Sequence, residues 1–199
     1  MQEKPDLAAL IGSRICHDLI SPIGAIGNGV ELMMMERSAA ASPELALIAE
    51  SVAHANARIR YFRVAFGAAG GDQRIARGEV VSILNDMTRG GRLVIDWQSP
   101  GEMARREVKL VFLLLQCLET AMPYGGKVRI ERGDSGWRMQ AEAARLKIDP
   151  ALWEMLSERH PPAEIGAAQV HFALVPEELR AQGRRLVAEL QDTTIRLTV

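Results

Sequence analysis

The sequence is poor in cysteine and has no excess of charge of either sign. Its 199 residues include two cysteines, Cys16 and Cys117, which are too few for a disulfide framework and lack the spacing of a metal-binding pair. Lys and Arg number 24 against 25 Asp and Glu, a formal net charge of -1, which does not indicate a nucleic-acid-binding surface. We therefore expect a protein of a reducing cytoplasm that binds no nucleic acid.

Long hydrophobic runs are also missing. The longest purely aliphatic or aromatic run covers residues 110–115, whereas a membrane-spanning helix needs about 20 apolar residues. The first six residues, MQEKPD, do not resemble a signal peptide. Hydrophobic residues nevertheless make up 48% of the chain, enough to build a core. We expect a soluble, cytoplasmic protein that does not contact a membrane.

Two long amphipathic helices are predicted in the first third of the chain. Apolar residues recur every three or four positions over residues 5–36, and again from residue 45 until the glycine-rich segment 67–71. Ser42 followed by Pro43 is typical of a helix N-terminus. The first stripe consists of Leu7, Ile11, Ile15, Leu19, Pro22, Ile26, Val30 and Met33, and the second of Leu45, Ile48, Val52, Ala55, Ile59, Phe62 and Phe66.

Two such helices joined by a short turn form an antiparallel hairpin, which cannot cover its apolar stripes alone. A second copy would cover them, so we predict a C2 homodimer with a four-helix bundle, formed by residues 1–70. The alternative is that the hairpin packs on the C-terminal part of its own chain. Segment 67–71 is interpreted as a linker.

Residues 71–199 are predicted to form a separate domain of the α+β class, with helices on one face of a mainly antiparallel sheet. Gly133-Asp-Ser-Gly136 is expected to be a hairpin turn. Segment 167–183 is ambiguous but has helical spacing. The predicted helices are residues 79–87, 105–121 and 150–158, and the predicted strands are residues 92–97, 127–132, 137–143 and 193–199.

One histidine stands out on the first helix. At about 100° per residue, His17 lies about 195° from the apolar stripe, on the side away from the hairpin core, so it should face solvent. The residues on that side are small or polar, unlike the long charged side chains of an ordinary solvated face, so another folded surface could approach closely. The predicted partner-binding residues are Ser13, Arg14, Gly24 and Asn28, beside Ser21.

The surroundings of His17 suit nucleophilic chemistry. A neutral imidazole has a free ring nitrogen near neutral pH because its ordinary pKa is about 6.5. Asp18 could accept a hydrogen bond from the other ring nitrogen. Pro22 cannot donate to the carbonyl of Asp18, so we expect a loosened turn there. Each feature alone is common by chance; their combination favours a functional site.

The run His17-Asp-Leu-Ile-Ser-Pro22, followed by Ile-Gly-Ala-Ile-Gly-Asn-Gly-Val-Glu-Leu, resembles the phosphoacceptor box of histidine kinase dimerisation domains. It more closely resembles the ChpT-type histidine phosphotransferases of alphaproteobacteria, and the resemblance covers the whole chain. It implies a dimeric four-helix bundle and a C-terminal domain shaped like a kinase ATP-binding domain that has lost its nucleotide. It also implies that His17 is the phosphoacceptor, that Asp18 is the acid after it, and that Ser21 is the polar residue four positions on.

The resemblance further implies partners and no cofactor. Phosphoryl groups would arrive from the receiver domain of a hybrid histidine kinase and leave to response-regulator receivers, with magnesium supplied by the receiver. Gln116, Glu119 and Thr120 stand where the magnesium-binding asparagines of kinases would be sought, and no Asp-x-Gly-x-Gly motif follows the strands. ATP use is therefore not expected.

Two other functions remain open at the level of sequence. The first is a non-catalytic dimeric adaptor that keeps the kinase-like shape only to bind signalling partners. A metal enzyme is the weaker alternative, because His54, His160 and His171 show no i,i+4 spacing. On the second helix, Arg58, Arg60 and Arg63 are candidate partner contacts, although an ordinary solvated face would explain them equally well.

Overall fold

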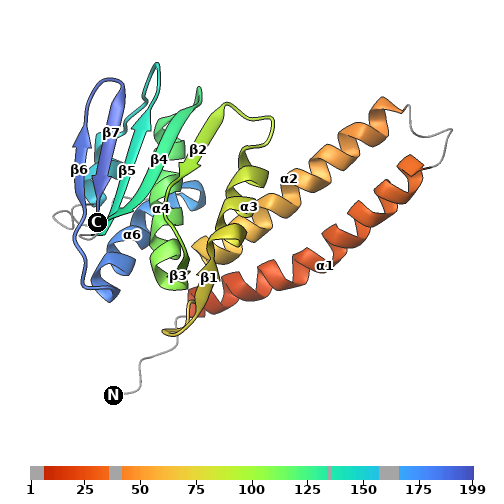
Figure 1. Ribbon diagram of the computed structural model, residues 1–199, viewed down its shortest axis with the longest axis horizontal. Helices are drawn as coiled ribbons and strands as arrows, with labels where there is room; N and C mark the ends of the chain where they lie inside the picture. The colour runs from red at the N-terminus through yellow and green to blue at the C-terminus, as the bar shows by residue number, and fades with distance from the viewer. Residues whose placement is uncertain (1–6, 36–41, 134–135, 157–165) are drawn as a thin grey trace.

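A computed structural model describes residues 7–35, 42–133, 136–156 and 166–199, except for the side chains of residues 7–11, 13, 14, 17 and 18. A long helical hairpin projects from a body of helices and sheet (Figure 1). This mixed architecture confirms the predicted α+β class. None of the helices in these ranges is long and apolar enough to cross a membrane.

The hairpin consists of α1 (Leu7–Met35) and α2 (Pro43–Ala65), which confirms both predicted helices within the described ranges. Pro22 lies inside α1, which is helical on both sides of it. The hydroxyl of Ser42 accepts a hydrogen bond from the backbone N–H of Leu45 at 3.4 Å, so the predicted N-cap of α2 is confirmed. Pro43 occupies the first turn, where its missing N–H costs nothing.

Among the described residues, the face of α1 that packs on α2 includes one member of the predicted apolar stripe, Val30, and otherwise lies beside that stripe. Cys16 and Val30 are buried there, and Gly27 brings the helices so close that an added Cβ would lie 3.2 Å from Cγ1 of Val52. The predicted stripe, in contrast, is largely uncovered. Its members Ile15, Leu19, Ile26 and Met33 are 53%, 45%, 50% and 53% exposed.

The C-terminal half of α2 packs on the body of the molecule. Tyr61 is buried, stacks on Phe112 with 4.6 Å between the ring centroids, and donates its hydroxyl to the Phe112 carbonyl at 2.6 Å. Val64 and Ala65 are buried in the same core. The hairpin thus packs partly on its own chain, as in the alternative considered above. Leu47 and Ile48, in the N-terminal half of α2, stay exposed. The division into two domains near residue 70 stays a prediction.

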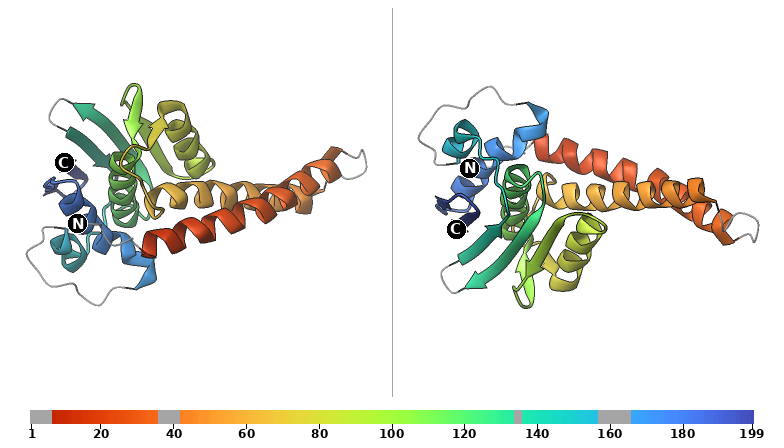
Figure 2. Two further views of the ribbon diagram at one scale, coloured as in Figure 1. Left: turned by 90° about the horizontal axis from the view of Figure 1, so that it is seen from below. Right: turned by 90° about the horizontal axis from the view of Figure 1, so that it is seen from above.

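The body is built on a five-stranded sheet with the order β2-β4-β5-β7-β6, in which β2 and β4 are parallel and the other pairs are antiparallel. One face is buried by helices and the other carries polar side chains: Val128 and Ile130 are buried, whereas their neighbours Lys127 and Arg129 are exposed. Figure 2 shows the helices beside the sheet. The strands are β2 (Leu93–Trp97), β4 (Gly126–Gly133), β5 (Gly136–Glu142), β6 (Val187–Leu190) and β7 (Thr194–Thr198).

The helices of the body are α3 (Arg77–Thr88), α4 (Arg105–Ala121), α5 (Pro150–Met155) and α6 (Val170–Ala181), with a short 3-10 turn at Ala167–Gln169. The bounds of α4 agree with the prediction, and 167–183 is mainly helical. The predicted helix 150–158 ends at Met155, and its last two residues lie outside the described residues. The centre of the predicted turn 133–136 also lies outside them. Strand β6 and the two-stranded ladder of β1 (Arg74–Ala76) and β3 (Glu102–Ala104) were not predicted.

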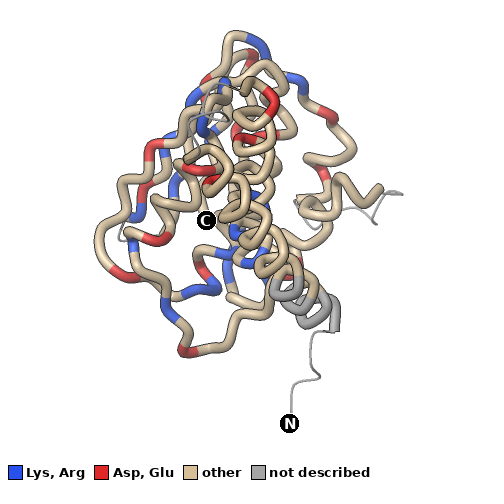
Figure 3. Tube along the Cα trace, turned by 90° about the vertical axis from the view of Figure 1, so that its right-hand side faces the viewer, with Lys and Arg blue, Asp and Glu red and all other residues tan. Residues whose placement is uncertain are grey.

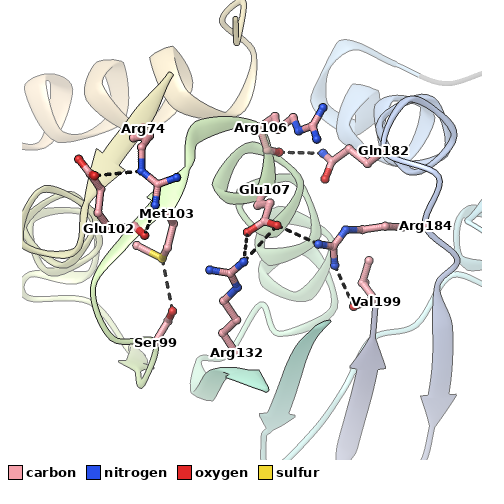
Figure 4. Close-up of polar contacts among 10 residues, drawn as sticks. All are labelled: Arg74, Ser99, Glu102, Met103, Arg106, Glu107, Arg132, Gln182, Arg184 and Val199. Carbon is pink, nitrogen blue, oxygen red and sulfur yellow. Dashed lines mark hydrogen bonds and ion pairs between the residues drawn. The ribbon is translucent and has the colours of Figure 1, made fainter. Parts of the chain in front are cut away.

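The N-terminus of α4 is fixed by ion pairs across the layers (Figure 4). The carboxylate of Glu107 lies 3.0 Å from Arg132 on β4 and 2.9 Å from Arg184, which follows α6. Acidic groups in the first turn of a helix are also favoured by the helix dipole. These contacts join α4 to the sheet and to the chain after α6.

Candidate functional site

The residues predicted to act lie along one side of α1, but their side chains are only partly described. Residue 17 lies in the middle of α1. The side chains of His17, Asp18, Ser13 and Arg14 lie outside the described set, so the predicted exposure of His17 stays a prediction.

The described members of this side are exposed or half-buried. Ser21 and Asn28 are exposed. A Cβ built on Gly24 would meet nothing within 4 Å. Over these three positions the α1 backbone is open to the approach of another surface, while the predicted partner-binding role of these residues stays a prediction.

A groove borders this side of α1. It has a volume of about 390 Å³ and lies between α1, α2 and the end of α3. Ile20 lines it from α1, and residue 17 precedes Ile20 by three positions, so helix geometry puts residue 17 one turn earlier on the neighbouring part of the surface. The polar residues lining the groove are His54, Asn56, Arg60, Arg63, Asp86 and Arg89.

The three arginines predicted as candidate partner contacts are engaged within the chain. Arg60 lies 2.9 Å from Asp86 of α3, Arg63 lies 3.6 Å from Glu79 of α3, and Arg58 lies 3.5 Å from Glu119 of α4. These pairs are partly exposed, so each contributes little to stability. Together these pairs join the side of α2 that carries the arginines to α3 and α4. Asp86 also contacts Arg89 at 2.5 Å.

Of the three α4 residues at the positions searched for magnesium ligands, Thr120 contacts α6 and Gln116 is buried, whereas Glu119 is partly exposed and pairs with Arg58 of α2. Thr120 Oγ1 lies 3.2 Å from His171 Nε2, and Lys109 Nζ lies 2.5 Å from a carboxylate oxygen of Glu178. Burial lowers the pKa of His171 to about 4, so this imidazole is neutral at pH 7. The apolar α6 residues near these two contacts, Phe172, Val175 and Leu179, are buried.

Chemically, this site offers positioning and charge. Within the described part of the chain, no cluster of three or more His, Cys, Asp or Glu residues is placed to hold a metal ion. The site's distinctive features are the open side of α1 and the arginines beside it, which suit the approach of a folded, anionic partner.

Comparisons with known proteins agree with this architecture. Residues 77–194 match the family model described as the histidine phosphotransferase C-terminal domain. The protein phosphotransferase ChpT of Brucella abortus (strain 2308) is 34% identical over 181 residues, which cover 87% of this chain and 86% of that protein.

A solved structure supports the same assignment over almost the full length. A bacterial phosphotransferase, determined at 1.7 Å, has a TM-score of 0.68 at 30% identity and covers 99% of this chain and 97% of that one. A mycobacterial sensor histidine kinase, MprB, reaches a TM-score of 0.41 at 16% identity, covering 63% of this chain and 94% of that one, a likeness too low to establish a shared fold.

The hairpin, the α+β body and these matches define a phosphotransferase of the histidine type. The chain belongs to the ChpT-type histidine phosphotransferase family.

Proposed function

We propose that this chain relays phosphoryl groups through His17 between the aspartates of receiver domains, as an intermediate of a bacterial two-component phosphorelay. The main support is the open side of α1, where Ser21, Gly24 and Asn28 leave the helix accessible on the side of residue 17. Membership of the family supports the chemistry.

The transfer itself needs few catalytic groups. A lone pair on one ring nitrogen of His17 attacks the phosphorus of an aspartyl phosphate on the receiver. The P–O bond to the aspartate breaks, and the carboxylate leaves with the electron pair. The second ring nitrogen keeps its proton and is proposed to donate a hydrogen bond to the carboxylate of Asp18. Ser21, one turn farther, is proposed to contact the phosphoryl oxygens. Magnesium on the receiver neutralises the charge that moves, while this chain supplies position.

The working form is proposed to be a homodimer. The uncovered residues Ile15, Leu19, Ile26 and Met33 form a continuous apolar row along α1. A second hairpin packed on this row would complete a four-helix bundle, and each fully buried aliphatic side chain would contribute about 1.5–3 kcal/mol.

Ile26→Asp tests the dimer. It places a charge in the proposed interface and should shift the mass measured by light scattering from dimer to monomer at micromolar concentration. Val94→Asp is the control, because Val94 is also exposed, at 57%, but lies on the sheet. An unchanged mass for Ile26→Asp would contradict this interface.

The proposed relay does not use ATP. The support comes from α4, where Gln116 is buried and Thr120 Oγ1 lies 3.2 Å from His171 Nε2 of α6. Calorimetry with magnesium and ATP should therefore detect no micromolar binding. Micromolar affinity would make the chain a kinase candidate instead.

The assignment of His17 is tested by phosphotransfer from a panel of phosphorylated receiver domains to the purified protein. The wild type should acquire an acid-labile phosphate, and His17→Ala should acquire none while keeping its dimer mass. His171→Gln, on α6, is the matched control and should still be labelled, because His171 is buried and lines neither cavity beside α1. Normal labelling of His17→Ala would refute the assignment. Receiver binding without any label on the wild type would favour the non-catalytic adaptor.

A further inference from the structure

The groove beside α1 continues along α2. A second cavity of about 540 Å³ shares His54, Asp86 and Arg89 with the first and extends over the α3–β2 turn to the end of α4. We call these two adjoining cavities together the arginine groove. One end of it adjoins Ile20, next to the position of the proposed phosphoacceptor.

The arginine groove carries an excess of positive charge. Five arginines line it, against two acidic residues, Asp86 and Glu119. This excess is local, because the chain as a whole has a formal net charge of -1. Figure 3 shows basic residues where α2 meets the body of the molecule, while the outer hairpin is mostly uncharged. The five arginines are Arg58, Arg60, Arg63, Arg89 and Arg92.

The wall formed by the α3–β2 turn is fixed by backbone contacts. Gly125 has a φ of +90° and lies so close to Arg92 that an added Cβ would overlap the Cβ and carbonyl oxygen of Arg92. The N–H of Gly126 donates to the Arg92 carbonyl at 3.0 Å. Asp86 contacts both Arg60 and Arg89 and so joins the two walls. A partner would therefore meet arginines whose backbone positions are already set.

We propose that the arginine groove receives an acidic surface segment of the docked receiver, adjoining the loop that carries the phosphorylated aspartate. This inference rests on the proposed function and adds the α3–β2 turn, through Arg89 and Arg92, as a specificity-determining wall. Receivers with acidic residues at that position associate faster because the groove steers them, and receivers with basic residues there are disfavoured. The groove is open to solvent along its length, which suits a segment of a protein surface. A small-molecule ligand is usually bound in a more enclosed pocket.

The test is the second-order rate of phosphotransfer from one receiver that labels the wild type. Arg89→Glu/Arg92→Glu should lower this rate about tenfold or more at low salt, within the range of electrostatic steering. The difference from the wild type should shrink at 1 M salt, where the Debye length is about 3 Å. Replacing the receiver's acidic residues outside its active site by amides should reduce the effect of the groove variant.

The control is Arg129→Glu/Arg196→Glu, which makes the same change in net charge on the open sheet face. Arg129 and Arg196 are 53% and 52% exposed and also contact acids, so this pair should change the rate less than about twofold. If Arg89→Glu/Arg92→Glu fails to fold by circular dichroism, Arg89→Gln/Arg92→Gln makes the same comparison. Equal rates for groove and control variants, with His17 still labelled, would overturn the groove proposal alone. Absence of label on the wild type from every receiver would overturn the proposed function.

Discussion

The contact between Tyr61 and α4 gives a sharp prediction about how the hairpin is joined to the body. Tyr61→Phe removes only the hydroxyl that donates to the Phe112 carbonyl at 2.6 Å, and it keeps the ring stack at 4.6 Å. Phe112 lies in the middle of α4, so its carbonyl keeps its helical partner. The loss is therefore the net value of one buried hydrogen bond, about 1–1.5 kcal/mol, or about 4 °C in Tm for a chain of this size.

Thermal and urea unfolding measure this loss, with Tyr124→Phe as the control. The chain has two tyrosines, and Tyr124 is 58% exposed, so the control should change the free energy of unfolding by less than about 0.5 kcal/mol. Burial also raises the pKa of Tyr61 well above its ordinary value. In Tyr124→Phe, where Tyr61 is the sole tyrosine, phenolate absorbance should appear only when the protein unfolds in alkali. Equal stability of the two variants, or early ionisation of Tyr61, would refute this packing.

Three further predictions concern the body of the molecule. The folded-state pKa of His171, about 4, lies below its unfolded value of about 6.5. The contribution of neutral His171 to the free energy of unfolding should therefore be fully present above pH 6.5 and fall by up to about 3 kcal/mol towards pH 4. His171→Gln should flatten this pH dependence, measured by urea unfolding at several pH values. Gly125→Ala should lower Tm more than Gly90→Ala, because both have positive φ but only Gly125 adjoins other atoms; equal losses would contradict the close approach. Lys109→Met should cost about 3 kcal/mol by leaving Glu178 unpaired, and Lys109→Met/Glu178→Leu should recover much of it in urea unfolding.

The sequence predicted best those elements whose residues share one environment, such as a helix that is buried on nearly all sides. In α4, the run of leucines is buried on nearly all sides, so its limits could be read from composition alone. Strand β6 was missed because all four of its residues are exposed and no alternation marks it. The second packing face of α2 was missed because its buried residues Ala57, Tyr61 and Val64 lie in the last turns of the helix and include a polar hydroxyl, so they form no stripe along the whole helix.

The candidate site was predictable only on the side that one helix forms. The motif around His17 is local, and Ser21, Gly24 and Asn28 follow from helical spacing. The opposite wall is not local, because Arg60 meets Asp86 across 26 positions and Arg58 meets Glu119 across 61. A single sequence does not reveal such pairs. The arginines were therefore predicted as candidate contacts with a partner, although each forms an ion pair with an acidic residue of its own chain.

The packing of α6 on α4 bears on how a nucleotide site could be introduced into this domain. With asparagine at positions 116 and 120, position 120 would still face His171 of α6 and position 116 would still be buried. Removing α6 from this place would expose apolar surface and leave Lys109 without Glu178. If the protein binds no ATP, as we propose, then introducing a nucleotide site here would require moving α6 as well as exchanging side chains on α4.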